Sequence, residues 1–293
     1  MTDPFTGTGV ALVTPFHSDR SIDFEALGQM VNHVIEGGVE YIVALGTTGE
    51  SVTLAKEEKK EVVEHIIHTA DKRVPVVMGI SSNDTYYLQE TIKQTDFSGV
   101  AAILSVAPYY NKPSQKGLYE HFSAVSKASP VPVILYNVPG RTSSNINAET
   151  TVWLASNHKN IIGIKEASRD LVQIMQIIKN KPDHFHVISG DDTFTLPMIL
   201  LGGSGVISVI ANSHPRQYSD MVRAALKRDC KKANELHYLL LDYISALFEE
   251  GSPTGVKAAL EIMGLCEKTV RLPLVSASDK LTEKLRKMIA ETG

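Results

Sequence analysis

At 293 residues the chain is longer than most domains built on one hydrophobic core, although parallel α/β barrels commonly reach this length as a single domain. Its 43% hydrophobic and 21% charged residues are ordinary for a globular protein, and a formal net charge of -4 provides no field that would attract nucleic acid. The two cysteines, Cys230 and Cys266, are too few and too far apart for a disulfide framework or a thiolate metal site, so we expect a reducing, cytoplasmic location. No segment approaches the roughly 20 apolar residues that span a bilayer, and we expect no membrane partner.

Short apolar runs alternate with amphipathic stretches along the chain, as expected for strands that are buried on both faces and joined by crossover helices. The expected strands are residues 9–14, 41–45, 75–78, 100–106, 132–136, 161–164, 186–189 and 205–208. The expected helices between and after them are 23–36, 57–70, 84–95, 115–128, 148–156, 168–179, 192–201 and 215–227. An open doubly wound sheet would carry a glycine-rich turn after its first strand, whereas this turn reads Val13-Thr14-Pro15-Phe16. The pattern therefore predicts an α/β fold, a closed (β/α)₈ TIM barrel.

Three further helices, 230–249, 254–264 and 279–291, are expected after the eighth strand–helix unit. We divide the chain into a catalytic barrel, residues 1–227, and a C-terminal three-helix appendage, residues 228–293. In such a barrel the active site lies at the carboxyl ends of the strands, so polar residues that end a strand are the functional candidates.

The turn after the second strand places Thr47 and Thr48 between two glycines, in the segment Gly46–Ser51. Backbone N–H groups and hydroxyls in such a turn can hold a small anion, although the same residues could simply cap a helix. The fourth strand leads into a loop that prolines stiffen on both sides and that presents Tyr109 and Tyr110. We interpret these two aromatic residues as a contact feature, with cover for a neighbouring helix as the alternative.

The fifth strand ends at Tyr136, whose phenol could move protons, and Arg141 follows in the next loop with a guanidinium suited to a carboxylate. The sixth strand, Ile161-Ile162-Gly163-Ile164, leads directly into Lys165. A lysine at the barrel mouth would be desolvated, and its neutral amine could attack a carbonyl. The alternative is that Lys165 reaches water and pairs with Glu166 or Asp170.

The seventh strand is followed by Asp191 and Asp192, a pair that invites a metal hypothesis. No third ligand lies beside them at a recognisable spacing, so we expect these carboxylates to cap a helix and we expect no metal site.

Together these segments resemble the pyruvate-dependent class I aldolase family, whose members include dihydrodipicolinate synthases and N-acetylneuraminate lyases. The resemblance runs from Gly9 to Ser208. The segments Gly46–Ser51, Tyr136–Thr142 and Gly163–Ser168 look like the synthases rather than the lyases.

The resemblance implies roles for individual residues. Lys165 would form an imine with pyruvate, and Tyr136 would relay protons with Thr47. Tyr110 matches a residue that completes this relay in the adjacent subunit. The resemblance also implies substrate-binding roles for four residues: Thr48 for the pyruvate carboxylate, Arg141 for the carboxylate of aspartate semialdehyde, and the backbone of Gly190 and Ile207.

The implied reaction condenses pyruvate with L-aspartate 4-semialdehyde through an imine and an enamine, without a metal or organic cofactor. The implied assembly is at least a homodimer, with a homotetramer common in the family. Synthases that lysine inhibits place histidine and glutamate where this chain has Lys56, Lys59 and Tyr87, so we expect weak or absent lysine feedback.

Two other functions compete with this interpretation. One is another aldolase of the same family, acting on N-acetylneuraminate or a keto-sugar acid, which would give the Arg141 guanidinium no obvious partner. The other is a non-catalytic barrel that senses a keto acid, which would not require Lys165 together with Tyr136 and Thr47.

Overall fold

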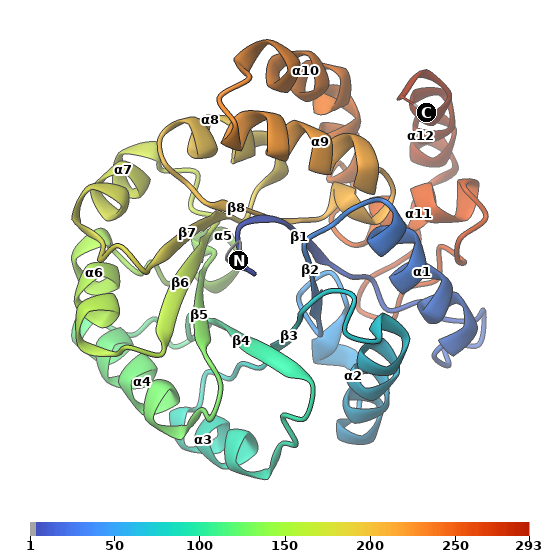
Figure 1. The fold of residues 1–293 in the computed structure, drawn as a ribbon. Helices are drawn as coiled ribbons and strands as arrows, with labels where there is room; N and C mark the ends of the chain where they lie inside the picture. Colours follow the sequence, from blue (N-terminus) through green and yellow to red (C-terminus); the bar gives the residue numbers. More distant parts are fainter. Residues whose placement is uncertain (1–3, 293) are drawn as a thin grey trace.

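The computed structural model describes residues 4–292, which form a closed barrel of eight parallel strands surrounded by helices (Figure 1). The strands follow one another around the barrel in chain order, and β1 closes it by pairing with β8. They are β1 (Gly7–Ala11), β2 (Tyr41–Ala44), β3 (Val76–Gly79), β4 (Val100–Val106), β5 (Val133–Asn137), β6 (Ile161–Glu166), β7 (His186–Ser189) and β8 (Gly205–Ser208). The predicted TIM barrel is confirmed.

Eight helices cover the outer face of this barrel: α1 (Phe24–Glu36), α2 (Lys56–Ala70), α3 (Thr85–Gln94), α4 (Gln115–Ala128), α6 (Ala148–Asn157), α7 (Leu171–Asn180), α8 (Thr195–Leu200) and α9 (Pro215–Leu226). The single-turn helix α5 (Pro139–Thr142) directly follows β5. Three single-turn 3₁₀ segments, η1 (Ser51–Thr53), η2 (Asp192–Phe194) and η3 (Ile210–Asn212), lie in loops that follow strands. Within residues 4–292, no helix has both the length and the apolar character to cross a membrane.

Side-chain caps fix where several of these helices begin. A side-chain oxygen accepts a hydrogen bond from a first-turn backbone N–H at Asp23, Asp84, Ser114, Asn147 and Asp170. Such a cap satisfies an amide that has no partner inside the helix. At these five helices the short polar residue before the amphipathic run therefore fixes where the preceding loop ends.

The first strand lies earlier in the chain than the predicted 9–14. The ladder continues only to Leu12, whose N–H donates to the Val43 carbonyl, and the N–H of Val13 instead donates to the Asn212 side chain at 3.1 Å. The apolar run thus continues past the strand because Leu12 and Val13 stay buried after leaving the sheet. Apolar character alone does not mark the end of a strand in such a segment.

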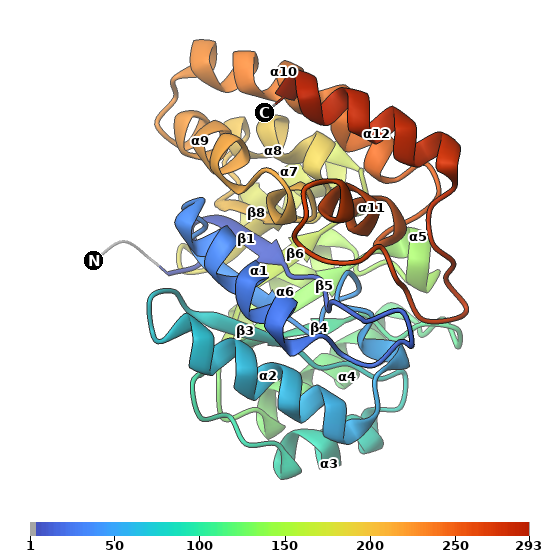
Figure 2. The same cartoon turned by 90° about the vertical axis from the view of Figure 1, so that its right-hand side faces the viewer.

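Helices α10 (Cys230–Leu247), α11 (Thr254–Ile262) and α12 (Asp279–Thr292) follow the barrel units. Helix α10 packs against α9, α11 and α12 pack against α10 and against each other, and α11 also contacts η3. In Figure 2, α11 and the short α5 lie on the side of the molecule away from the amino terminus, the side on which the chain leaves the strands. The boundary at 227/228 falls between α9 and α10, and the division into two units there stays a prediction.

Candidate active site

Lys165 and Tyr136 lie side by side at the carboxyl ends of two neighbouring strands. They are direct partners in the register of β5 and β6, and the Lys165 amine lies 4.5 Å from the centre of the Tyr136 ring. Only 6% of the Lys165 surface and 7% of the Tyr136 surface are exposed. Since alternate residues of a strand point to opposite faces, this register directs both side chains to the same face of the sheet, the barrel interior.

Burial lowers the pKa of Lys165 to about 8, because an ammonium loses hydration inside the barrel. The carboxylate of Asp192 opposes this shift, and the positive charge of Arg141 adds to it. At pH 7 about one amine in ten is then neutral, against fewer than about one in a thousand for an ordinary lysine. This site therefore holds a nucleophilic amine near neutral pH.

The next residue, Glu166, points to the opposite face of the strand. Its buried carboxylate accepts hydrogen bonds from the Asn137 side chain at 3.1 Å, the Ser168 N–H at 2.8 Å and the Gln173 side chain at 3.0 Å. Asp170 caps α7 instead. The alternative in which Lys165 reaches water to pair with Glu166 or Asp170 is therefore wrong.

Gly190 leaves room for the Lys165 side chain. A Cβ atom at residue 190 would lie 3.0 Å from both Cγ and Cε of Lys165 and 2.9 Å from the Ala167 Cβ. Contacts this short are repulsive, so any larger residue would displace the lysine. Ile207 of β8 is buried in the same interior cluster as Tyr136.

Thr47 and Thr48 lie in the turn after β2. The Arg141 charge and the Thr47 hydroxyl, which interacts with the Tyr136 phenol, oppose the rise that burial causes in the pKa of Tyr136. Thr47 is exposed and Thr48 is buried. The turn leads into the 3₁₀ segment η1, and α2 begins only at Lys56, so the two threonines do not cap an α-helix.

Arg141 lies in the single-turn helix α5 rather than in an open loop. Its side chain is exposed, yet its charge affects the pKa of both Lys165 and Tyr136. The guanidinium is therefore near the two interior groups and accessible to an anion from solvent.

Tyr110 faces solvent within this chain, whereas Lys165 is buried. Tyr110 is 89% exposed and has a left-handed backbone with a φ of 73°, and its neighbour Tyr109 is partly exposed. An unpaired aromatic side chain held outward by a strained loop is accessible to a second molecule.

The two aspartates after β7 cap local backbone. Asp191 accepts from the Thr193 N–H at 3.0 Å and pairs with Arg169, and Asp192 accepts from the Val209 and Ile210 N–H groups, each at 3.0 Å. Among residues 4–292, no three His, Cys, Asp or Glu side chains are placed to hold a metal ion together.

Two buried polar arrangements were not found from the sequence. One is the Glu166–Asn137 contact, for which the period-two direction of strand residues was the available signal. The other joins Glu50 to Lys257, which are 207 residues apart and carry no local signal.

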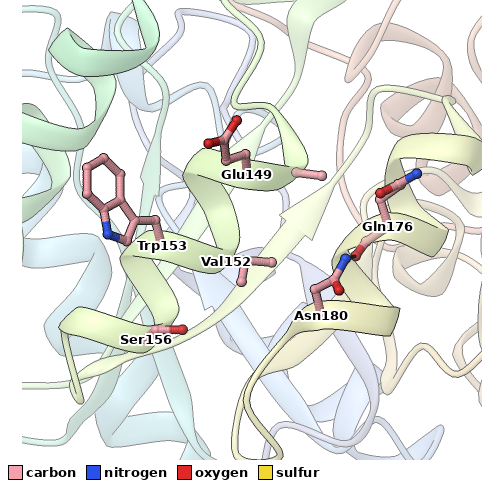
Figure 3. A pocket seen from close by; sticks show the side chains of 7 residues that line it. Glu149, Val152, Trp153, Ser156, Gln176 and Asn180 are labelled. Carbon is pink, nitrogen blue, oxygen red and sulfur yellow. Dashed lines mark hydrogen bonds between the residues drawn. The ribbon is translucent and has the colours of Figure 1, made fainter.

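A surface pocket of about 450 Å³ lies outside the barrel, between α6 and α7. Figure 3 shows Val152 of α6 pointing toward Asn180 of α7, whereas the Trp153 ring lies on the other side of α6. Glu149 is its one ionisable lining residue, and no nucleophile with an adjacent base lines it. It is a weaker candidate for chemistry than the barrel interior around Lys165.

The sequence and the fold both have known relatives. A family model described as the dihydrodipicolinate synthetase family matches residues 4–292. A 4-hydroxy-tetrahydrodipicolinate synthase of Flavobacterium psychrophilum is 56% identical over 281 residues, which cover 96% of each chain. The solved dihydrodipicolinate synthase of Thermotoga maritima is 38% identical, with a TM-score of 0.96 over 99% of each chain. A solved monomeric dihydrodipicolinate synthase variant is 39% identical, with a TM-score of 0.96 over 99% of this chain and 97% of the other.

Proposed function

This chain belongs to the dihydrodipicolinate synthetase family, and we propose on that basis that it condenses pyruvate with L-aspartate 4-semialdehyde to 4-hydroxy-tetrahydrodipicolinate. It is a lyase of the lysine and diaminopimelate pathway. The observation that carries the proposed chemistry is the buried Lys165 amine, with a pKa of about 8, beside the Tyr136 phenol.

The reaction begins when the neutral Lys165 amine attacks the keto carbon of pyruvate. Loss of water from the resulting carbinolamine gives a protonated imine, which withdraws electrons from the adjacent methyl group. The Tyr136 phenol, which interacts with the Thr47 hydroxyl, moves protons to and from the carbinolamine oxygen that leaves as water. The Thr48 turn holds the pyruvate carboxylate.

Carbon–carbon bond formation follows from the same imine. A methyl proton leaves, and the enamine carbon attacks the aldehyde carbon of the semialdehyde, whose own carboxylate binds the Arg141 guanidinium. The substrate amine then replaces the Lys165 amine at the imine carbon, which closes the ring and releases the enzyme. Because the iminium serves as the electron sink, the reaction requires neither a metal nor an organic cofactor.

We propose that the enzyme works in the cytoplasm and that its smallest active unit is a dimer. The exposed Tyr110 supports the dimer, since its side chain is free to enter the site of an adjacent subunit. Pairing of dimers into a homotetramer is the further assembly that we expect.

A coupled assay tests this function. The activities of wild type, Lys165→Ala and Arg141→Ala are measured with pyruvate and aspartate semialdehyde as substrates. In a second experiment each protein is reduced with borohydride in the presence of pyruvate, and the mass of the peptide that contains residue 165 is determined by mass spectrometry. Lys165→Ala should form no adduct, whereas Arg141→Ala should still trap pyruvate but use the aldehyde poorly. An unmodified wild-type Lys165 peptide would refute the imine. A wild-type pyruvate adduct without turnover of aspartate semialdehyde would favour an aldolase acting on a sugar acid, and full activity of Arg141→Ala would show that Arg141 does not bind the aldehyde.

A further inference from the structure

A buried ion pair connects the C-terminal helices to the turn that carries Thr47 and Thr48. The ammonium of Lys257, in α11, lies 2.6 Å from Oε1 of Glu50 and donates to the Thr269 carbonyl at 2.9 Å. Lys257 is 0% exposed and lies 4.0 Å from the centre of the Phe16 ring. A fully buried lysine thus meets one carboxylate, one carbonyl and one aromatic face.

The second oxygen of Glu50 is also held by the C-terminal region. Oε2 accepts the N–H of Arg271 at 2.9 Å. The Arg271 guanidinium in turn pairs with Glu58 of α2 at 2.6 Å and donates to the Thr53 carbonyl at 3.0 Å. Glu50 and Thr53, in the second half of the 47–53 segment, are therefore attached to residues beyond position 250.

Glu50 lies two residues after Thr48 in a tight turn. Its backbone is left-handed with a φ of 52°, and its N–H donates to the Thr47 carbonyl at 3.1 Å. The residue before it, Gly49, is fixed by Thr14, whose hydroxyl donates to the Gly49 carbonyl at 2.8 Å. Moving the Glu50 carboxylate would therefore move the backbone of both threonines.

Stability alone gives a weak reason for this ion pair, because a buried pair seldom stabilises a fold more than apolar residues of similar volume would. Its distinctive effect is geometric, since a 2.6 Å contact between two immobile groups fixes the position of one element against another. We propose that Lys257 is a positioning residue which, through Glu50, sets the Thr47–Thr48 turn for the pyruvate carboxylate and for Tyr136. This inference rests on the proposed function.

The test separates positioning from folding. Lys257→Met, Glu50→Gln and the double variant are compared with wild type and with Leu281→Ala, a control that removes buried contacts from α12 and leaves every group of the ion pair in place. Three quantities are measured: the pyruvate concentration for half-maximal borohydride trapping, the midpoint of thermal unfolding, and amide hydrogen exchange of residues 46–53. Glu50→Gln preserves side-chain volume, so it tests the inference even where Lys257→Met folds poorly.

Each single variant should raise the half-saturating pyruvate concentration about tenfold and speed exchange in the turn, because small misplacements of binding groups are costly. Leu281→Ala should lower the unfolding midpoint but change neither the half-saturating pyruvate concentration nor the exchange rate of the turn. The double variant should regain thermal stability, since neither buried charge is then left unpaired, while its half-saturating pyruvate concentration stays raised.

The inference is overturned if pyruvate saturation follows the unfolding midpoint across all variants, or if the single variants saturate and exchange as wild type does. Failure of wild type to trap pyruvate would refute the proposed function instead. The exchange of residues 46–53 would still decide whether the ion pair holds the turn.

Discussion

The Lys165 amine lies over the Tyr136 ring at 4.5 Å from its centre, in the closed interior of the barrel. An aromatic face favours a cation above it, whereas loss of hydration disfavours the charged form. The lowered pKa of about 8 shows that desolvation dominates. The same burial that makes the amine reactive also places a cost on the folded state.

The rate of imine formation should follow the titration of Lys165. The second-order rate constant for borohydride trapping of pyruvate should rise about tenfold per pH unit below pH 8 and level off above it, because only the neutral amine attacks. Quenched-flow trapping between pH 6 and 10.5 measures this profile. A rate that keeps rising past pH 10 would mean that Lys165 titrates as an ordinary lysine.

Lys165→Met should abolish activity and stabilise the fold at pH 7. The unfolded chain holds its proton up to the ordinary pKa of 10.5, and the folded chain only up to about 8, so the folded state is destabilised by roughly 3 kcal/mol at pH 7. This cost is complete below pH 8 and fades as the pH rises toward 10.5. Denaturant unfolding at pH 7 and pH 10 should therefore show an advantage of the Met variant that shrinks at the higher pH.

Gly190→Ala should impair catalysis by displacing the lysine rather than by removing a reactive group. The new methyl would press on Cγ and Cε of Lys165, each 3.0 Å away, and on Ala167. Overpacking of this kind costs about 1–3 kcal/mol, and the trapping rate should fall with it. Gly140→Ala is the matched control, because an added Cβ there meets no atom within 4 Å. Equal trapping rates in the two variants would show that Gly190 does not constrain the lysine.

The barrel could be predicted from the sequence because strands buried on both faces produce short apolar runs at regular intervals. The end of β1 could not, because Leu12 and Val13 stay buried after the chain leaves the sheet. Lys165 and Tyr136 could be predicted as site residues because each stands directly at the end of an apolar run.

Partnerships across the chain were harder to predict. Glu166 follows Lys165 but faces Asn137 on the other side of the strand, and only the period-two direction of side chains separates the two roles. Glu50 and Lys257 meet through the packing of α11 on the barrel, which no local pattern encodes.

Lysine should inhibit this enzyme weakly or not at all. Lys56 and Lys59 lie on α2 and Tyr87 is exposed on α3, so the three positions at which the resemblance implies an effector site carry two cations and no carboxylate. A cationic amino acid is repelled by such a site. Activity measured with up to millimolar lysine tests this, and the double variant Lys56→His/Tyr87→Glu should be more sensitive. Inhibition of wild type at micromolar lysine would contradict the prediction.

Two inactive variants should restore activity together if Tyr110 serves the adjacent subunit. Lys165→Ala lacks the amine but presents an intact Tyr110, and Tyr110→Phe has the amine but lacks the outward hydroxyl. In a two-fold dimer assembled at random from equal amounts, half of the dimers are hybrids with one complete site, so activity should reach about a quarter of the wild-type value. Co-refolding the two chains and assaying against each one refolded alone measures this gain, with sedimentation confirming the dimer. Activity equal to the mean of the separately refolded variants would contradict the prediction. It would mean that the 89% exposed Tyr110 side chain does not complete the site of the adjacent subunit.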